Sequence, residues 1–404
     1  MRYLFVADGR SPIALNWLQH FVQTGHEVHL ASTYPCQPEL NLASLHIIPV
    51  AFSGAAGEKP KPTGGETHAR KNSAVRTLTT PRLRTAIRQW LGPLTLPRAG
   101  RRLRALIQTL RPDLVHAMRI PYEGMITALA KGSGSPLGTP PCVVSVWGND
   151  FTLHAKSTPL MAYYTRLALR HADALHTDCF RDLRLAGEWG FAPNKPSLTV
   201  PGNGGIDLSL FYPSTTPKTP SHSEGVTVVN PRGFRAYVRN DTFFKAIPLV
   251  LAKTPQTRFV LPAMAGDPHA TPYQNWLHAN HLAHAVDFLP HIPRPQMADL
   301  FRQAALAVSP SEHDGTPNTL LEAMACGCLP IAGDIEALRE WITPGENGFL
   351  FDPGDASALA ACIVSGIENA DLREEAAKKN ARLVADRAEY GASMVKAELF
   401  YARL

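Results

Sequence analysis

Two acidic residues and the turn between them form the segment of this chain with the clearest chemistry. Asp314 and Glu322 lie eight residues apart, separated by a Gly-Thr-Pro-Asn turn and the start of an apolar run. The preceding run 306–309 predicts a short buried strand that ends at Pro310. A helix that begins near Asn318 would offer unpaired backbone N–H groups and its positive dipole end to a phosphate. The two carboxylates could then accept hydrogen bonds from hydroxyl groups on either side of that phosphate, an order of groups found in nucleotide sugars.

This segment resembles the signature of family 4 of the retaining glycosyltransferases, the family that includes glycogen synthases and phosphatidylinositol mannosyltransferases. In that family two acids separated by seven residues hold the donor sugar and the ribose. The resemblance assigns the donor sugar to Asp314, where glutamate is usual, and the ribose to Glu322. The alternative is that Asp314 only organises the turn and Glu322 is a solvated helix residue.

The helix start is expected to contact the donor phosphates through its backbone N–H groups. Pro317 has no backbone N–H and is therefore not among these donors. The predicted donor contacts of this turn and helix are Gly315, Thr316, Asn318, Thr319 and Leu320. The run from Leu289 to Ile292 resembles the family's turn that holds the nucleotide base through backbone atoms. Backbone recognition leaves no side-chain code, so UDP, GDP and ADP donors cannot be separated, and a UDP- or GDP-sugar is the expected donor.

Three arginines follow the first predicted strand of the second half and could neutralise a diphosphate. In the family, an arginine directly after this strand and a basic residue a few positions later clamp the phosphates. Arg232 matches the first position, whereas Arg235 and Arg239 both remain open for the second. The planar guanidinium fork suits bidentate phosphate contacts. The alternative is that some of these arginines cap the following helix or lie in solvent.

Three features of the first half resemble donor- or sugar-contacting positions of the family. Gly9 follows the first strand, where a glycine allows close backbone approach to a phosphate or sugar. His116 ends a later strand and is the candidate that touches the reacting sugar, since Met118 stands where many members have a second histidine. A histidine at a strand end is otherwise often a satisfied core residue. The segment 147–150, Trp-Gly-Asn-Asp, resembles a motif near the sugar.

Short apolar runs alternate with helical patterns along the whole chain, which predicts parallel sheets covered by helices. In the first half the predicted strands are 3–7, 28–31, 45–50, 113–117, 142–146, 174–177 and 197–200, with a helix at 13–24 after the first. In the second half they are 226–230, 258–262, 286–289, 306–309, 329–332 and 349–351.

This pattern predicts an α/β protein with two doubly wound Rossmann-like domains that face a central cleft, the GT-B fold of the family. The predicted divisions are an acceptor-side domain over 1–211, a Pro- and Ser-rich linker over 212–225 and a nucleotide-sugar-binding domain over 226–385. The last segment, 386–404, resembles the terminal helix that crosses back onto the first domain.

Composition restricts the class of protein without selecting a substrate. The 404 residues are enough for two domains, and the net charge of +6 is compatible with anionic partners of several kinds. No apolar run reaches membrane-spanning length, and the six cysteines lack the paired spacing of zinc or disulfide frameworks. We therefore expect a cytoplasmic protein with reduced thiols, no metal ion and no nucleic-acid partner.

A basic stretch in the first half suggests a possible second surface. Residues 68–111 contain ten arginines, and within 81–91 the apolar residues fall on one helical stripe opposite them. Such a helix could lie on the anionic inner face of a membrane, so 81–104 is a candidate for peripheral membrane contact. The alternative is a helix that packs on its own domain with a solvated basic face.

The expected function is therefore metal-independent, retaining transfer of a hexosyl group from a nucleotide sugar to a hydroxyl acceptor. Arg232, Asp314 and His116 are the predicted catalytic residues, and the sugar nucleotide is a co-substrate with no further cofactor. The acceptor could be a glycan, a lipid or a small molecule. A nucleotide-sugar epimerase of the same fold and a non-catalytic sugar-nucleotide-binding protein are the alternatives.

Overall fold

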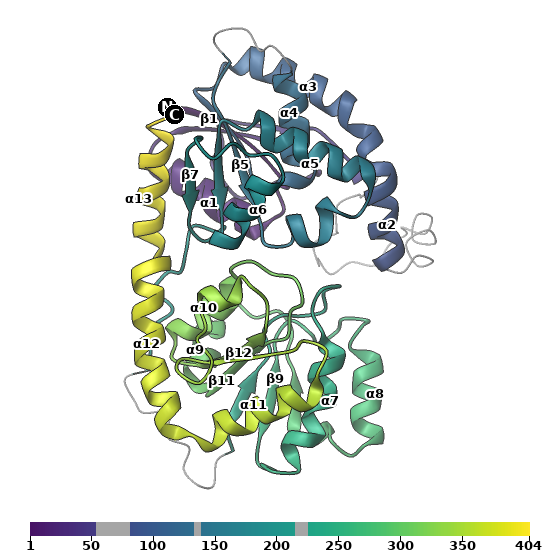
Figure 1. The fold of residues 1–404 in the computed structure, drawn as a ribbon, viewed down its shortest axis with the longest axis vertical. Coiled ribbons are helices and arrows are strands. Elements are labelled where there is room, and N and C mark those ends of the chain that lie inside the picture. The colour runs from purple at the N-terminus through teal and green to yellow at the C-terminus, as the bar shows by residue number, and fades with distance from the viewer. Residues whose placement is uncertain (54–80, 133–138, 215–224) are drawn as a thin grey trace, which may run out of the picture. The chain divides into compact units, whose positions relative to one another are not determined.

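The computed structural model describes residues 1–53, 81–132, 139–214 and 225–404, with side chains described from residue 86 onward in the second range. The chain divides into two compact units (Figure 1). Unit 1 comprises Met1–Asn203 and Lys396–Leu404, and unit 2 comprises Gly204–Val395. Most of the predicted linker, residues 215–224, lies outside the described residues.

Unit 1 is built on a parallel sheet of seven strands in the order β3-β2-β1-β4-β5-β6-β7. Its strands are β1 (Arg2–Ala7), β2 (Glu27–Ser32), β3 (Ser44–Ile47), β4 (Leu114–Ala117), β5 (Cys142–Val146), β6 (Ala174–Thr177) and β7 (Ser197–Thr199). The helices between them are α1 (Pro12–Gln23), α2 (Pro81–Leu91), α3 (Leu96–Leu110), α4 (Met125–Lys131), α5 (Pro159–His171) and α6 (Phe180–Glu188).

Unit 2 repeats this architecture with six parallel strands in the order β10-β9-β8-β11-β12-β13. Its strands are β8 (Thr227–Val229), β9 (Arg258–Leu261), β10 (Val286–Phe288), β11 (Leu306–Ser309), β12 (Leu329–Gly333) and β13 (Phe349–Phe351). Its helices are α7 (Asn240–Leu251), α8 (Thr271–Ala279), α9 (Arg294–Gln303), α10 (Asn318–Ala325), α11 (Ala356–Glu368), α12 (Ala370–Ala388) and α13 (Tyr390–Tyr401), whose last turns belong to unit 1.

The strand order reverses once in each sheet, and this position matters for function. In unit 1, successive strands of the chain are added outward from β1 to β3 on one side of the sheet and outward from β4 to β7 on the other. The order therefore reverses between β1 and β4, and in unit 2 it reverses between β8 and β11. In doubly wound sheets, ligands bind at the carboxyl ends of the strands where the order reverses. The loops after β1, β4, β8 and β11 are therefore the expected ligand-binding positions.

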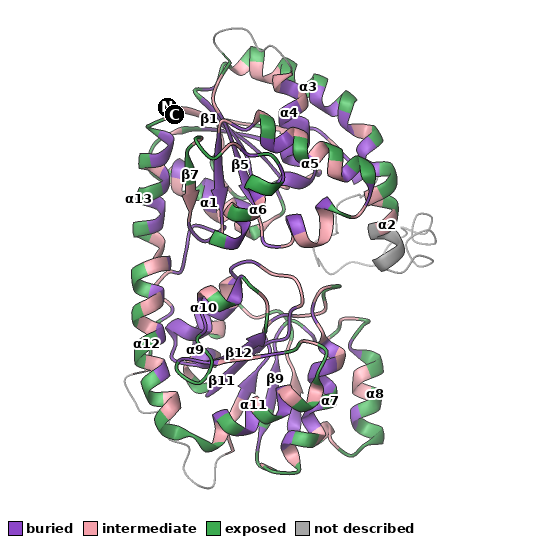
Figure 2. Cartoon of the chain, viewed as in Figure 1, coloured by how far each residue is buried: buried purple, intermediate pink, exposed green. Residues whose placement is uncertain are grey.

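All thirteen predicted strands are present, with bounds that differ by at most a few residues at each end. The central strands are largely buried in Figure 2 because both faces of each sheet are covered by helices, whereas the edge strands β3 and β7 are partly exposed. Two doubly wound Rossmann-like domains are thus confirmed. The boundary between the compact units lies at Asn203, not at 211, because Ile206 and Phe211 are fully buried in the core of unit 2.

The end of α13 packs in the core of unit 1 through Tyr401. Tyr401 is 1% exposed, and its ring stacks on Phe21 with centroids 5.0 Å apart. Its hydroxyl accepts a hydrogen bond from the indole N–H of Trp17 at 3.0 Å and bonds Nδ1 of His116. Nearby, Glu398 bonds the ring of His20 at 2.8 Å. The final turns of α13 therefore complete the hydrophobic core between α1 and β4.

Candidate functional site

The strand-order reversal in unit 2 brings together two of the predicted catalytic residues. Arg232 follows β8 and is only 7% exposed, whereas Asp314 lies in the loop after β11. Arg232 donates from Nη2 to Oδ2 of Asp314 at 2.5 Å, and its own backbone N–H is held by the side chain of Asn230 at 3.1 Å. A buried arginine and a partly buried acid therefore share one site at the carboxyl ends of adjacent strands.

The N-terminus of α10 lies beside this ion pair. Nη1 of Arg232 donates to the hydroxyl of Thr319 at 3.3 Å, so the arginine spans from the loop acid to the first turn of the helix. Thr316, in the preceding turn, accepts from the indole N–H of Trp341 at 3.2 Å. The backbone N–H of Leu320 donates to the carbonyl of Pro317 at 3.0 Å. The N–H of Leu320 therefore already has a partner in the turn, and the predicted phosphate contacts of this turn and helix stay predictions.

Several buried polar atoms at this site have no hydrogen-bond partner within the part of the chain that the structure describes. They are Nε of Arg232, Oδ1 of Asn318, and the hydroxyls of Ser309 and Ser311. Buried polar atoms in folded proteins are nearly always paired with protein, water or ligand. Their concentration around the end of β11 and the start of α10 is the property expected of a site that receives a polar ligand.

The two remaining arginine candidates differ in their surroundings. Arg239 donates to both carboxylate oxygens of Asp241, at 2.9 and 3.0 Å, and lies 3.6 Å from Glu312. Arg235 is exposed and donates to the hydroxyl of Tyr237 at 3.0 Å. Arg239 thus has two acidic partners and stands at the N-cap position of α7, where its side chain makes no capping hydrogen bond. Arg235 is the better placed of the two for binding an added anion.

Glu322 lies on α10 and is nearly buried, with 8% of the residue exposed. Burial raises the pKa of its carboxyl to about 7, although Arg294 partly opposes this. Nη2 of Arg294, at the start of α9, lies 3.4 Å from Oε1 of Glu322. Glu322 is therefore not a solvated helix residue.

Ile292, proposed from sequence to contact the base, is half-buried in the loop between β10 and α9 that leads to Arg294.

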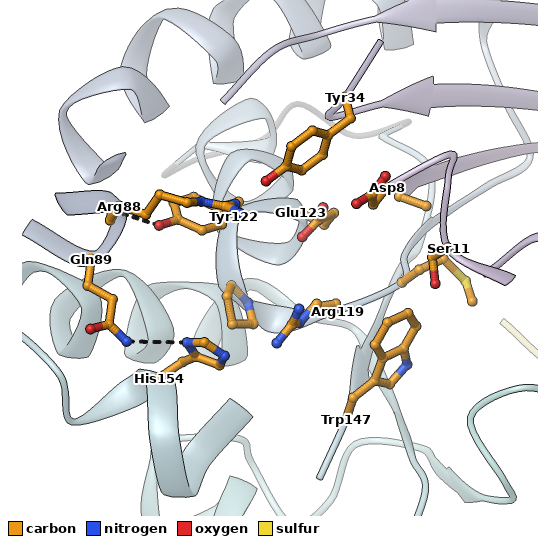
Figure 3. A pocket seen from close by; sticks show the side chains of 13 residues that line it. Asp8, Ser11, Tyr34, Arg88, Gln89, Arg119, Tyr122, Glu123, Trp147 and His154 are labelled. Atoms are coloured by element: carbon orange, nitrogen blue, oxygen red, sulfur yellow. Dashed lines mark hydrogen bonds between the residues drawn. The ribbon is translucent and has the colours of Figure 1, made fainter. Parts of the chain in front are cut away.

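Unit 1 contains a pocket at its own strand-order reversal (Figure 3). The pocket has a volume of about 230 Å³ and is formed mainly by the residues that follow β1, β4 and β5 together with α2. Its lining includes Asp8, Ser11, Tyr34, Arg88, Gln89, Met118, Arg119, Tyr122, Glu123, Trp147 and His154. Sequence reasoning singled out Trp147 but missed Tyr34, Tyr122 and Glu123, which come from separate segments without a shared motif.

Two buried acids support the wall of this pocket. Asp150, from the predicted Trp-Gly-Asn-Asp motif, is 1% exposed and accepts from Arg119 at 3.0 Å and from the backbone N–H of Trp147 at 3.2 Å. Glu123 is 5% exposed and accepts from the hydroxyl of Thr33 at 2.6 Å. The residue before it, Tyr122, has φ +70°, a strained conformation for a side chain of this size. Asp150 thus fixes the loop, and Glu123 reaches the pocket itself.

Two predicted residues of unit 1 lie outside this pocket lining. His116 is fully buried, and its ring nitrogens bond Ser145 at 2.7 Å and the hydroxyl of Tyr401. This geometry favours the alternative that His116 is a satisfied core residue. Gly9 is buried, and a Cβ there would lie 2.4 Å from Sγ of Cys36. Close packing against the β2 side of the sheet therefore already requires glycine at this position.

Replacing Glu123 with glutamine is expected to remove a pH-dependent loss of stability in unit 1. Burial raises the pKa of Glu123 to about 7, while Thr33 and Arg119 oppose this and Asp8 adds to it. The folded state therefore binds the proton more tightly than the unfolded state, and stability falls as pH rises from about 4.5 through about 7. The raised pKa corresponds to a change on the order of 3 kcal/mol.

Thermal unfolding of both proteins, compared at about pH 4 and about pH 8.5, measures this effect. Glu123→Gln should match the wild type at the lower pH and exceed its melting temperature at the higher pH. Glu188→Gln is the control, because Glu188 is an exposed carboxylate on α6. Equal melting temperatures at the higher pH would show that the Glu123 proton is not retained by the fold.

Comparison with known proteins agrees with this architecture in both halves. The model of the glycosyl transferases group 1 matches residues 216–383, and that of the glycosyl transferase 4-like domain matches residues 9–202. The chain belongs to the group 1 glycosyltransferases. The matched ranges contain the Arg232–Asp314 site in unit 2 and nearly all of the pocket in unit 1.

Relatives of this glycosyltransferase are distant in sequence. One is the D-inositol 3-phosphate glycosyltransferase 2 of Catenulispora acidiphila, 29% identical over 210 residues, which is 48% of this chain and 48% of that protein. The chain spans about half the length of the first curated relatives that it matches.

Two solved structures show the same fold. The sucrose-phosphate synthase of Thermosynechococcus elongatus has a TM-score of 0.74 at 16% identity, covering 100% of this chain and 99% of that one. Anabaena HepE, solved in complex with UDP, has a TM-score of 0.71 at 15% identity, and the match covers 100% of both chains.

In the described part of this glycosyltransferase, no helix has both the length and the apolar character that crossing a membrane requires.

Proposed function

We propose that this glycosyltransferase transfers a hexosyl group from a nucleotide sugar to a hydroxyl acceptor, with retention of the anomeric configuration. The observation that carries the proposal is the arrangement of Arg232, Asp314 and Thr319 at the start of α10. There, a buried cation, a helix N-terminus and a carboxylate are combined as a sugar diphosphate requires. UDP bound to HepE, a protein of the same fold, supports a nucleotide-sugar donor.

In the proposed reaction, the bond between the anomeric carbon and the phosphate oxygen breaks, and negative charge develops on the departing diphosphate. Arg232 and the N–H groups at the start of α10 stabilise that charge, and Arg235 supplies the second cation. Asp314 binds hydroxyls of the donor sugar, while Glu322 binds the ribose. A donor phosphate oxygen takes the proton of the acceptor hydroxyl, so the scheme needs no separate protein base.

Hydrolysis of a panel of UDP- and GDP-sugars in the absence of acceptor tests the proposal. A transferase should release the nucleoside diphosphate slowly from one donor class, and the anomer of the released sugar reports retention. An epimerase would return an isomerised nucleotide sugar, and a binding protein would leave the donor intact. Addition of EDTA should not change the rate, because the proposed charge stabilisation comes from arginines and backbone N–H groups.

The ribose contact predicts a pH-dependent nucleotide affinity. Glu322→Ala should weaken binding of the nucleoside diphosphate about ten-fold, because a buried carboxylate that accepts hydroxyl hydrogens is lost. Because the pKa of Glu322 is about 7, wild-type affinity should rise with pH through that value as the carboxylate forms.

Calorimetric titration of wild type, Glu322→Ala and Glu322→Gln between about pH 5.5 and about pH 8.5 separates these effects. Titration of the nucleotide's own phosphate is common to all three proteins, so only the difference between them reports Glu322. Unchanged nucleotide affinity in Glu322→Ala would show that Glu322 does not bind the ribose. A pH profile of Glu322→Gln identical to that of the wild type would show that titration of Glu322 does not control the affinity.

A cytoplasmic location with peripheral contact to the inner face of a membrane remains part of the proposal. Large apolar side chains in 81–104 are exposed, namely Ile87, Trp90, Leu91 and Leu94, with exposed fractions of 40 to 66%. Arg98, Arg101 and Arg102 on the neighbouring α3 are exposed as well. Apolar and cationic groups on adjoining helices suit an anionic lipid surface.

A further inference from the structure

The turn that joins β11 to α10 is contacted by a tryptophan that has no part in the donor chemistry proposed above. Trp341 follows the short 3₁₀ helix η6 (Leu338–Glu340), which lies between β12 and β13. Its indole N–H donates to the hydroxyl oxygen of Thr316 at 3.2 Å. Trp341 is 5% exposed and Thr316 is 6% exposed, so this hydrogen bond is shielded from water. The contact joins two segments that are 25 residues apart in sequence.

This hydrogen bond restricts the conformation of the turn. An indole N–H can only donate, so the oxygen of Thr316 accepts from Trp341 and the hydroxyl hydrogen must point to an acceptor on another side. Arg232 holds the same turn by its bond to Asp314, and it also reaches Thr319 in the first turn of α10. The turn is therefore held at its ends by Arg232 and in its middle by Trp341.

The indole is itself immobilised by residues of α12, a helix that packs against α10 (Figure 1). The guanidinium of Arg387 lies 4.2 Å from the ring centre of Trp341, and its Nη1 donates to the carbonyl of Glu340 at 2.6 Å. The carbonyl of Trp341 accepts from Nδ2 of Asn347 at 2.9 Å. Asn347 also bonds Asn380 of α12 at 2.8 Å, and both asparagines are buried. Trp341 is thus fixed both at the face of its ring and at its backbone.

The position of Arg387 also strengthens the hydrogen bond to Thr316. A cation above the face of an indole is attracted by the π electrons of the ring. It draws electron density away from the ring nitrogen, and a polarised N–H is a stronger hydrogen-bond donor. The effect is largest where water is excluded, as it is around Trp341 and Thr316.

We propose that Trp341 is a positioning residue of the donor site, which holds the turn between Asp314 and α10 through its hydrogen bond to Thr316. The inference rests on the proposed function, because it assigns a supporting residue to that same site. A shift of this turn would move both Asp314 and the N–H groups at the start of α10 relative to the departing diphosphate. Because these groups act on charge that develops in the transition state, loss of the bond should lower kcat more than it raises KM.

Donor hydrolysis by the full chain tests the proposal in wild type, Trp341→Phe, Thr316→Val and the double variant. Trp341→Phe keeps an aromatic ring but removes the N–H, whereas Thr316→Val keeps the shape of the side chain but removes the hydroxyl. Trp341→Phe should lower kcat about ten-fold and change KM by less than about three-fold. In the Thr316→Val background, the same replacement should change kcat by less than about two-fold, because the bond is already absent.

Replacement of Arg387 gives a graded test of the same contact. Arg387→Met removes the cation but keeps the apolar stem, so kcat should fall about three-fold, and Arg387→Lys should recover part of this loss. Trp276→Phe, at a tryptophan of α8 that is 36% exposed, is the matched control and should keep the wild-type kcat. If Trp341→Phe does not fold, the same cycle with Arg387→Met in its place decides the question.

Urea denaturation of each variant separates positioning from a purely structural role. A residue that only fills space would lower the free energy of unfolding, but the folded fraction would keep its kcat. The proposal is overturned when kcat of folded Trp341→Phe equals that of the wild type. It is also overturned when the effects of Trp341→Phe and Thr316→Val on kcat multiply in the double variant, as those of independent sites do.

Failure of this inference is distinguishable from failure of the proposed function. Donor hydrolysis by the wild type without an effect of Trp341→Phe overturns only the positioning role. Absence of both nucleotide binding and donor hydrolysis in the wild type overturns the proposed function and, with it, this inference.

Discussion

Arg232→Ala is expected to lower turnover of the nucleotide sugar by about 10²- to 10³-fold, the usual cost of removing one charge-stabilising group from an active site. Arg232 is 7% exposed and reaches both Asp314 and Thr319. Its unpartnered Nε leaves a donor for the ligand. Because charge grows on the departing diphosphate, the arginine should contribute more to turnover than to donor affinity.

The measurement is the steady-state rate of donor hydrolysis, with kcat and KM determined separately. Arg232→Lys retains the charge but lacks the bidentate fork, so it should recover only part of the rate. Arg258→Ala is the matched control in the same unit, because Arg258 pairs with Asp287 at 2.6 Å but is exposed and remote in sequence from the site. Turnover near the wild-type value in Arg232→Ala would show that another residue stabilises the phosphate charge.

Tyr401→Ala is expected to destabilise unit 1 by about 3–5 kcal/mol, the range for removing a buried aromatic side chain. Tyr401 is 1% exposed, stacks on Phe21, and hydrogen-bonds both Trp17 and His116. Tyr401→Phe keeps the ring but leaves those two partners without the hydroxyl, which should cost about 1–3 kcal/mol. The two variants therefore separate the packing contribution from the hydrogen-bond contribution.

Urea denaturation, with hydrogen exchange to identify the unit that unfolds, measures these changes. Protection of the β1 and β4 amides should fall in the order wild type, Tyr401→Phe, Tyr401→Ala, whereas the β8 and β11 amides should be less affected. Tyr163→Ala is the control, since Tyr163 is 58% exposed on α5. Equal protection of β1 in all proteins would show that the last turns of α13 contribute little to the unit 1 core.

The same geometry explains why His116 could not be interpreted from sequence. A histidine at the end of β4 is compatible with a pocket or with the core, and only long-range contacts decide between them. Here Ser145 of β5 and Tyr401 of α13 occupy both ring nitrogens. Burial also lowers the pKa of His116 well below its usual value. Tyr401 lies 285 residues away in sequence, and no local pattern indicates that contact.

Arg235 and Arg239 show a second limit of sequence patterns. Their spacing from Arg232 leaves both open as the second phosphate ligand, because either could extend from the loop after β8. The carboxylates of Asp241 and Glu312 surround Arg239, and Glu312 comes from the loop after β11. Charge compensation by a neighbouring acid and by Glu312, which is distant in sequence, therefore separates two arginines that local spacing could not.

The sequence alone determined the thirteen strands and the segment around Asp314 and Glu322. Short apolar runs between turn residues are a local signal, and the acid–turn–helix spacing is held within nine consecutive positions. Tertiary structure decided the burial that raises the pKa of Glu322 and Glu123 to about 7 and the pocket that Tyr34, Arg88 and Glu123 share. These properties depend on which distant segments exclude water from a side chain, and that is set only when the sheets and helices pack.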